Sequence, residues 1–359
     1  MSRATLVRMH DTERHRPAIP LVRRACLALL FATAGAHAAS FDCKAAKTST
    51  EKTICGSPKL SALDEKLARD YERALHALGP AGAARLKESQ RSWLRFATAV
   101  CVPRKPVDGG DPPASCLEME FGRRLEQLAQ AGVRVGPYVF NRIDFYSSAS
   151  TPGEGGQYSG FVTQHAGFPQ IDSPANAATA AWNAAMRKDD PGPVQGRGSP
   201  DEDVEDDDTD YTIGCAGGRF VSMQFDDSEY QHGTAHGGYH HQVNNMMLAP
   251  AARKMTADDL FAAKAPWKAK LPALFWRAYT QDPDANKDLP SIKEAIEAAA
   301  VDPERWLLTT EGLQISFDAY EAGCYACNPG PITAPWASLK PMLATPEFAA
   351  CKAPPTARP

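Results

Sequence analysis

The cysteines limit what this chain of 359 residues can fold into more than any other feature of its sequence. Nine are present, and the eight that follow Cys26 fall into two groups. The first group is Cys43, Cys55, Cys101 and Cys116, and the second is Cys215, Cys324, Cys327 and Cys351. In an oxidising compartment this even number predicts four disulfides and two modules that are stapled separately.

One apolar run, residues 25–36, indicates that the chain reaches such a compartment. Arg23 and Arg24 precede the run and Ala36-His37-Ala38 ends it, which is the order of a secretory signal peptide. A run of about 12 residues is too short for a bilayer core of roughly 30 Å. We therefore expect residues 1–38 to be a signal peptide and the mature protein to be periplasmic or secreted, with no stable membrane span after cleavage. A buried core helix is the alternative, and it leaves the flanking arginines unexplained.

Cleavage at this position makes the mature protein more acidic. The whole chain has a formal charge of −4, whereas residues 39–359 contain 33 Lys or Arg and 41 Asp or Glu, a formal charge of −8. An acidic exported protein is not expected to bind nucleic acid. A basic protein partner suits this charge better.

The pairing of the eight cysteines stays open in the sequence, although a bridge between Cys43 and Cys55 and no bridge between the two groups are expected. Closing residues 43–55 or 101–116 would each stabilise the fold by about 3 kcal/mol in the chain-entropy model. Cys324-Tyr-Ala-Cys327 has the spacing of a thiol redox pair. Its position after a predicted strand favours a structural disulfide, either between these two cysteines or with Cys215 and Cys351.

The first module has the pattern of a small helical bundle that ends near Gly132. Ser57-Pro58 predicts a helix start and Gly79-Pro80 its end. Further helices are predicted from about Ala83 and from Ser115, where Glu118 would complete a capping box. The apolar positions at helical spacing are Leu60, Leu63, Leu67, Tyr71, Leu75, Leu78, Leu86, Trp93, Ala97, Val100, Leu117, Phe121, Leu125 and Leu128.

The second module, expected over residues 138–352 after a linker at 132–137, has mixed patterns. Strands are predicted at residues 139–146, 158–162, 220–225 and 313–317, and helices after Ser173-Pro174, from Thr256, and at 267–279 and 292–300. The predicted fold class is therefore α+β, with a small disulfide-stapled helical bundle followed by an α+β domain that contains an antiparallel or mixed sheet.

An acidic tract spans residues 196–210, where eight of the ten residues from Asp201 to Asp210 are Asp or Glu. Such a block is typical of a solvated, mobile loop. It lacks the ligand spacing of a calcium loop. A docking surface for a basic partner is the remaining interpretation, and it makes Asp206, Asp207 and Asp208 candidate partner-binding residues.

No catalytic motif is present, so no enzyme activity, catalytic residue, cofactor or metal site is predicted. The densest group of possible ligands is His232, His236, His240 and His241. Their spacing could place zinc ligands on one face of a helix. The glycines between them favour a turn with local hydrogen bonds instead.

Residues 41–131 resemble the LprI-like lysozyme-inhibitor domain. The matching residues are Asp42-Cys43, Glu51, Ile54-Cys55, Pro58, Leu60, Leu63-Asp64, Leu67, Tyr71, Gln90, Trp93-Leu94, Cys101, Cys116-Leu117 and Arg124-Leu125. The chain departs from the family at Ala97-Thr98, where Arg-Asp is common, and at Phe121, where Tyr is usual. The resemblance implies a helical scaffold that binds lysozyme.

Residues 138–352 are similar to the C-terminal region of the anti-sigma factor RsiV and to the non-catalytic part of the deacetylase PdaC. The matching segments are Gly167-Phe168-Pro169-Gln170-Ile171, Trp182-Asn183, Gly233-Thr234-Ala235-His236-Gly237, Met255-Thr256, Asp259-Leu260-Phe261, Phe317, Tyr320, Tyr325-Ala326 and Pro335-Trp336. This resemblance also implies lysozyme recognition, with His236 and Tyr239 as further candidate partner-binding residues.

The two resemblances and the negative charge predict one function. We expect a secreted binding protein that sterically inhibits lysozyme or a related cell-wall hydrolase. An envelope enzyme or accessory module that acts on peptidoglycan, and a purely structural envelope protein, are the alternatives.

Overall fold

The computed structural model describes residues 39–102, 112–151, 160–187 and 205–354. The expected signal peptide lies outside these ranges. Among the described helices, none combines the length and the hydropathy that crossing a membrane requires.

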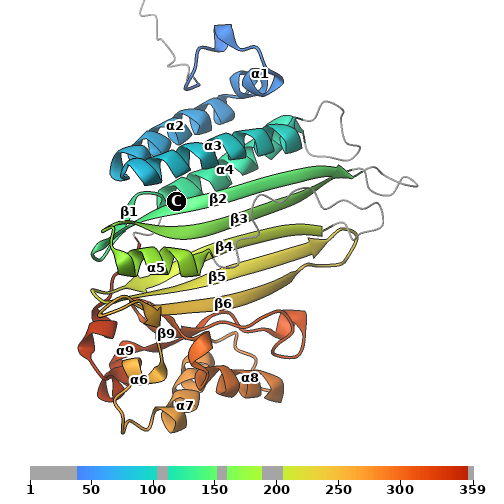
Figure 1. Cartoon of the computed structure of the whole chain (residues 1–359). Helices are drawn as coiled ribbons and strands as arrows, with labels where there is room; N and C mark the ends of the chain where they lie inside the picture. The colour runs from blue at the N-terminus through green and yellow to red at the C-terminus, as the bar shows by residue number, and fades with distance from the viewer. Residues whose placement is uncertain (1–38, 103–111, 152–159, 188–204, 355–359) are drawn as a thin grey trace, which may run out of the picture. The chain divides into compact units, whose positions relative to one another are not determined.

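The N-terminal part is a helical bundle, drawn from blue to teal in Figure 1. Its elements are η1 (Cys43–Ala45), α1 (Ser49–Gly56), α2 (Pro58–Ala77), α3 (Pro80–Cys101) and α4 (Pro113–Gln130). The helix predicted after Ser57 is confirmed, because the Ser57 side chain accepts from Leu60 N and Pro58 occupies the first turn. Leu60, Trp93 and Leu117 are each at most 1% exposed in the core of this bundle.

The predicted capping box at Ser115 is wrong. Helix α4 begins two residues earlier, at Pro113, and its N-cap makes no side-chain hydrogen bond. The carboxylate of Glu118 instead forms an ion pair with Lys59 of α2 at 2.6 Å. The side chain of Glu118, which the sequence pattern assigned to a local cap, therefore contacts the neighbouring helix α2 instead.

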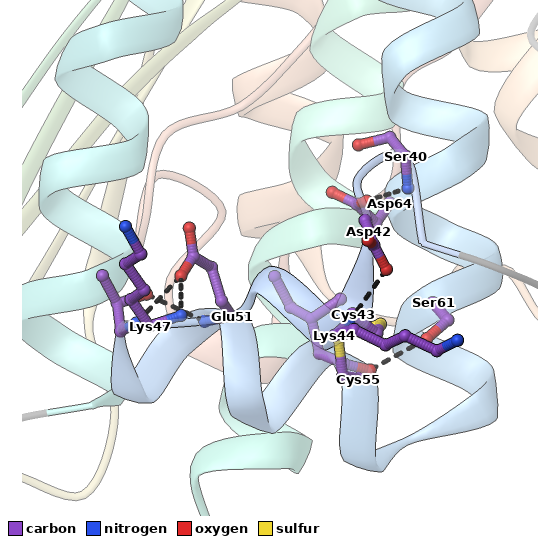
Figure 2. Close-up of a disulfide and its surroundings, with 11 residues drawn as sticks. Ser40, Asp42, Cys43, Lys44, Lys47, Glu51, Cys55, Ser61 and Asp64 are labelled. Carbon is purple, nitrogen blue, oxygen red and sulfur yellow. Dashed lines mark hydrogen bonds between the residues drawn. A yellow bond between two sulfur atoms is a disulfide. The ribbon is translucent and has the colours of Figure 1, made fainter.

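Two disulfides close the helical bundle, Cys43–Cys55 and Cys101–Cys116. Figure 2 shows the first of them, which ties η1 to the end of α1. Beside it, Glu51 accepts from the backbone N–H groups of Lys47 and Thr48, which completes a capping box at the start of α1. This short segment therefore depends on a covalent bond and a cap more than on apolar burial.

The following part contains a seven-stranded sheet in chain order. Its strands are β1 (Val133–Val135), β2 (Tyr138–Thr151), β3 (Gly160–Ser173), β4 (Glu205–Ala216), β5 (Phe220–Gln231), β6 (Gly238–Met247) and β7 (Arg253–Lys254). Neighbouring strands are antiparallel except β3 and β4, which pair in parallel over only three residues each. The sheet is therefore mixed, and the α+β fold class is confirmed.

The chain contains further helices, one that follows β3 and others in its C-terminal part. The helices are α5 (Ala177–Met186), α6 (Ala257–Leu260), α7 (Trp267–Thr280), α8 (Pro290–Ala300) and α9 (Trp336–Leu339), with short 3-10 helices at Pro303–Arg305 (η2), Tyr325–Cys327 (η3), Lys340–Met342 (η4) and Pro346–Ala350 (η5). A second sheet has the order β10 (Ile332–Pro335), β9 (Gly312–Ile315), β8 (Leu307–Leu308). Figure 1 shows α5 lying across the long strands, where its Trp182 ring packs on Phe140 of β2 at 5.8 Å.

The remaining cysteines pair as Cys215–Cys351 and Cys324–Cys327. The expected separation of the two groups is confirmed, because no disulfide joins the first four cysteines to the last four. Of the two pairings left open for Cys324 and Cys327, the structure has the bond between these two residues.

Two other expectations require correction. Residues 132–137 are not a plain linker, because β1 occupies Val133–Val135 and pairs with β2. The acidic tract is not a loop from Glu205 onward, because β4 begins there and pairs with β5 along its whole length. Residues 196–204 of the predicted loop lie outside the described residues.

Candidate functional site

A buried charge network joins α4 to the sheet. Asp144 of β2 accepts from Arg124 Nη1 at 2.8 Å and from Arg142 Nε at 2.6 Å. Arg142 Nη1 also donates to Asp210 of β4 at 2.6 Å. The side chains of Arg124, Arg142 and Asp144 are each 1% exposed. Buried charged groups require partners of opposite charge. Here the carboxylate of Asp144 pairs with the guanidinium groups of both Arg124 and Arg142.

His165 of β3 completes this network. Its Nε2 lies 3.2 Å from Asp144 Oδ1 and its Nδ1 lies 3.4 Å from Asp208 Oδ1. Burial alone would lower the pKa of His165, but the hydrogen bonds to Asp144 and Asp208 raise it to about 9. Burial would likewise raise the pKa of Asp144, but Arg142, His165 and Arg124 hold it well below its usual range. The histidine is therefore a cation and Asp144 an anion at neutral pH.

Gly167 allows this network to cross strand β3. A Cβ atom at this position would lie 2.3 Å from Arg142 Nη2. Any other residue would force the buried guanidinium of Arg142 to shift, so the glycine in the Gly167-Phe168-Pro169 segment has a packing reason.

Carboxylates line up on the paired strands β4 and β5. Asp210 lies opposite Asp226, and Asp207 lies opposite Glu229. Like charges directly across a strand pair destabilise a sheet unless other groups compensate them. The first pair is compensated, because Asp210 binds Arg142 and Asp226 lies 2.8 Å from His241 Nδ1.

The second pair is not compensated by charge. Asp207 accepts a hydrogen bond from the neutral amide of Gln164 at 2.8 Å. Within the described residues, the carboxylate of Glu229 has no hydrogen-bond partner, and its side chain is exposed. A Cβ at Gly238 would lie 2.7 Å from Glu229 Oε1, so this glycine leaves room for the carboxylate. Asp207 and Glu229 therefore form an anionic pair open to a cation.

Two hollows lie on the sheet where strands β3, β4 and β5 pass Gln164, Asp207 and Glu229. The strand register directs the side chains of Asp207 and Glu229 to one face and those of Asp206, Asp208 and Tyr230 to the opposite face. We call the first, of about 620 Å³, the acidic cleft; its lining includes Phe145, Gln164, Asp207, Asp227, Glu229, His240 and Tyr320. We call the second, of about 390 Å³, the aromatic groove; its lining includes Trp93, Phe96, Glu120, Tyr146, Asp206, Asp207, Asp208, Glu229, Tyr230, Tyr239 and Tyr325. The aromatic groove thus has walls from both the helical bundle and the sheet.

An aromatic cluster stands at the β6 side of the groove. The ring of Tyr325 stacks on His236 with centroids 4.0 Å apart and lies 5.7 Å from Tyr239. Tyr320 Oη lies 2.8 Å from His236 Nε2. The Cys324–Cys327 disulfide closes the 3-10 turn that carries Tyr325, so this bond fixes one edge of the groove.

The structure separates the three predicted aspartates. Successive side chains of a strand point to opposite faces. Asp206 accepts from Thr163 and pairs with His232, and Asp208 faces His165, whereas Asp207 points with Gln164 into the acidic cleft. Tyr239 lines the aromatic groove, and His236 stacks on Tyr325, which also lines it.

Sequence reasoning missed Asp227 and Glu229 on β5. The segment Phe225-Asp-Asp-Ser-Glu-Tyr carries an acidic signal, but only the strand register places Glu229 opposite Asp207. Arg124 was identified through its family motif, whereas its contact with the sheet was not expected.

The arrangement is suited to binding cations. Carboxylates with aromatic neighbours attract ammonium and guanidinium groups. In the part of the chain that the structure describes, no three His, Cys, Asp or Glu side chains gather as metal ligands. His232, His240 and His241 are each paired with an aspartate instead, as in His240 with Asp318 at 2.7 Å, and His236 contacts Tyr320.

Residues 43–131 match the family model of the lysozyme inhibitor LprI. That family is one of inhibitors and not of enzymes, and the match covers the helical bundle and both of its disulfides. No curated protein matches the chain.

Two solved structures of the DUF3298 family have some likeness to the chain. A protein from Bacteroides fragilis is 17% identical, with 60% of this chain and 98% of that chain covered and a TM-score of 0.39. A protein from Pseudomonas aeruginosa is 14% identical, with 59% and 96% covered and a TM-score of 0.38. The expected RsiV-like character of residues 138–352 stays a prediction.

Proposed function

We propose that this protein is exported to the periplasm or beyond the cell and that it binds lysozyme or a related cell-wall hydrolase. Inhibition is steric, because the bound protein covers the substrate cleft of the hydrolase. The family match over residues 43–131 carries this proposal. The formal charge of −8 on residues 39–359 supports it, because it favours encounter with a basic enzyme.

The disulfides support the proposed location. All eight cysteines after Cys26 are paired, which is the state expected in an oxidising compartment. The apolar run at residues 25–36 supplies a route to that compartment.

The test uses the chain expressed with its leader and purified from the periplasm. A molar excess should slow lysis of a cell-wall suspension by a c-type lysozyme, and a complex should elute from a sizing column at low salt. An oligosaccharide that fills the lysozyme cleft should compete with the protein if inhibition is steric. Unchanged lysis together with the absence of a complex would overturn the proposal.

A peptidoglycan-acting enzyme or accessory module is the second candidate, and no observation in the described residues favours it. Changed muropeptides after incubation of cell walls with the protein alone would support it over inhibition.

A further inference from the structure

We propose that the Cys324–Cys327 disulfide is a site of reversible thiol–disulfide exchange with a protein dithiol, and that its reduction releases Tyr325 from the edge of the aromatic groove. The resting state is the disulfide that the structure contains. The inference goes beyond the proposed function, because it concerns a covalent change in this chain and does not depend on the identity of the partner.

The two disulfides of the second cysteine group differ in how far solvent reaches them. Cys215 and Cys351 are 0% and 6% exposed. By contrast, Cys324 is exposed and Cys327 is half-buried. Exchange requires the attack of a thiolate on a disulfide sulfur, so access limits its rate, and exposed disulfides are more easily reduced than buried ones. A second protein can therefore reach Cys324, whereas Cys215 and Cys351 are protected by the fold.

Loop length separates this bond from a disulfide of similar access, Cys43–Cys55, in which Cys43 is exposed and Cys55 is half-buried. The paired cysteines are 3 residues apart in Cys324–Cys327 and 12 apart in Cys43–Cys55. A disulfide that stabilises the fold is stabilised by the fold to the same extent, so the bond that contributes less is easier to reduce. In the chain-entropy model these loop lengths correspond to about an eightfold difference in the reduction equilibrium. Cys324–Cys327 should therefore open first.

The exchange conserves atoms and electrons. A thiolate of the reductant attacks Sγ of Cys324, the sulfur–sulfur bond breaks, and Sγ of Cys327 leaves as a thiolate. In the mixed disulfide that results, the second thiolate of the reductant attacks the reductant's own bridged sulfur and releases Cys324. Two electrons pass from the reductant to the chain, whose two sulfurs take up two protons, and the reductant becomes a disulfide.

The side chain between the two cysteines forms part of the groove. The ring of Tyr325 stacks on His236 with centroids 4.0 Å apart and is edge-on to Tyr239 at 5.7 Å. Tyr239 and Tyr325 both line the aromatic groove. A change in the conformation of this turn therefore changes the surface that the groove presents.

Hydrogen bonds hold the base of the loop independently of the disulfide. Asn328 Oδ1 accepts from Ala322 N at 2.8 Å, and Asn328 Nδ2 donates to Tyr239 Oη at 2.8 Å. Between these anchors, Gly323 has a φ of +109°, a region that glycine enters and leaves without steric cost. Reduction therefore leaves residues 322 and 328 in place and frees Tyr325 to move without unfolding the sheet.

The first experiment measures which bond opens. The periplasmic protein is equilibrated with graded ratios of reduced to oxidised dithiothreitol, free thiols are trapped with N-ethylmaleimide, and the modified peptides are quantified by mass spectrometry. We expect Cys324 and Cys327 to be half-modified at a ratio about eightfold lower than Cys43 and Cys55, with unchanged circular dichroism. Thioredoxin, kept reduced by its reductase, should open the same bond and consume about one equivalent of NADPH per chain.

Two results of this experiment overturn the inference. One is the modification of Cys43 and Cys55 before Cys324 and Cys327 or together with them. The other is the modification of Cys324 and Cys327 only at ratios at which the circular dichroism of the folded protein is lost.

The second experiment follows the movement of Tyr325. Stacking places the ring protons of His236 in the ring current of Tyr325, so their NMR signals, assigned with His236→Gln, should shift on reduction at constant pH. Tyr325→Leu should abolish this shift. Unchanged His236 signals in the reduced wild-type protein overturn the release of Tyr325.

Matched variants separate the bond from side effects of the reductant. Cys324→Ser with Cys327→Ser should show the His236 signals of the reduced protein without any dithiol. Cys43→Ser with Cys55→Ser removes a disulfide outside the groove and should keep the signals of the oxidised protein. A shift of equal size in this control overturns the inference. Absence of lysozyme binding would overturn the proposed function alone, because neither experiment uses lysozyme.

Discussion

Arg124 of α4 and Asp144 of β2 form an ion pair of 2.8 Å in which both side chains are 1% exposed. Arg124 belongs to the part that matches the LprI family, and Asp144 belongs to the sheet that follows it. The helical bundle and the sheet therefore share a buried interface. Separating them would expose the charged side chains to solvent or leave one of them buried without its partner.

Replacing Arg124 by Met should destabilise the whole protein. The substitution leaves Asp144 with one fewer cation in a buried site, and the loss of one partner of a buried ion pair costs about 3–5 kcal/mol. Urea unfolding should show this loss, with helix and sheet signals changing in the same transition. Arg123→Met is the control, because the Arg123 side chain is 65% exposed, and a change below about 1 kcal/mol is expected. Two separated transitions in the wild-type protein would contradict a shared interface.

The stability of the protein should fall as the pH rises from about 6.5 to 9. The pKa of His165 is raised in the folded state to about 9, above its ordinary value of 6.5. Its contribution is complete below the ordinary value and disappears as the pH passes the folded value, with an upper limit of about 3 kcal/mol. Unfolding midpoints in urea across this range measure the effect. His165→Gln should flatten the decline, whereas His240→Gln, whose side chain is 60% exposed, should not.

The two C-terminal disulfides should differ in their effect on stability. Cys215 and Cys351 are 136 residues apart, and Cys324 and Cys327 are three apart. In the chain-entropy model the long loop contributes about 5 kcal/mol and the short one about 2 kcal/mol. Paired Cys→Ala variants, compared by urea unfolding, test this order. Mass spectrometry of the unreduced exported protein should find no free thiol, and equal losses in both variants would count against the prediction.

Neighbouring aspartates of β4 should respond differently to the same substitution. Asp208→Asn removes a partner of His165, so the pKa of this histidine should fall toward its ordinary value, which NMR titration of the ring can follow. Asp207→Asn should leave that titration unchanged. It should instead slow association with a basic partner and weaken the salt dependence of the rate, since it removes a charge from the acidic cleft. The reverse pattern would show that the two side chains do not point to opposite faces.

The sequence allowed the helices to be predicted well, because their signals are local. Ser57-Pro58 and the leucines at helical spacing set α2, and Trp267 and Ile292 fall in the predicted helices α7 and α8. The capping box of Thr256 with Asp259 is also present. Each of these features depends on residues within a few positions of one another.

The acidic strand could not be predicted in the same way. Composition alone makes residues 205–210 a solvated loop, and nothing nearby in the chain contradicts that interpretation. Its strand pairing depends on partners that are distant in sequence, such as His165 for Asp208 and Arg142 for Asp210. The position of Glu229 opposite Asp207 could not be predicted for the same reason, because it depends on the register of β4 and β5.

The short parallel ladder between β3 and β4 has a consequence for how the molecule opens. Backbone pairing across it is limited to Gln164–Ala166 with Asp207–Thr209, whereas β2 with β3 and β4 with β5 pair along most of their lengths. The side-chain bonds of His165 to Asp208 and of Arg142 to Asp210 cross the same line. The shortest ladder between the long strands β2 to β6 therefore does not coincide with the boundary between the family match and the rest of the chain. Under native conditions, amide protons on either side of this ladder should exchange as two separate cooperative blocks, one that includes α4 with β2 and β3 and one that includes β4 with β5 and β6.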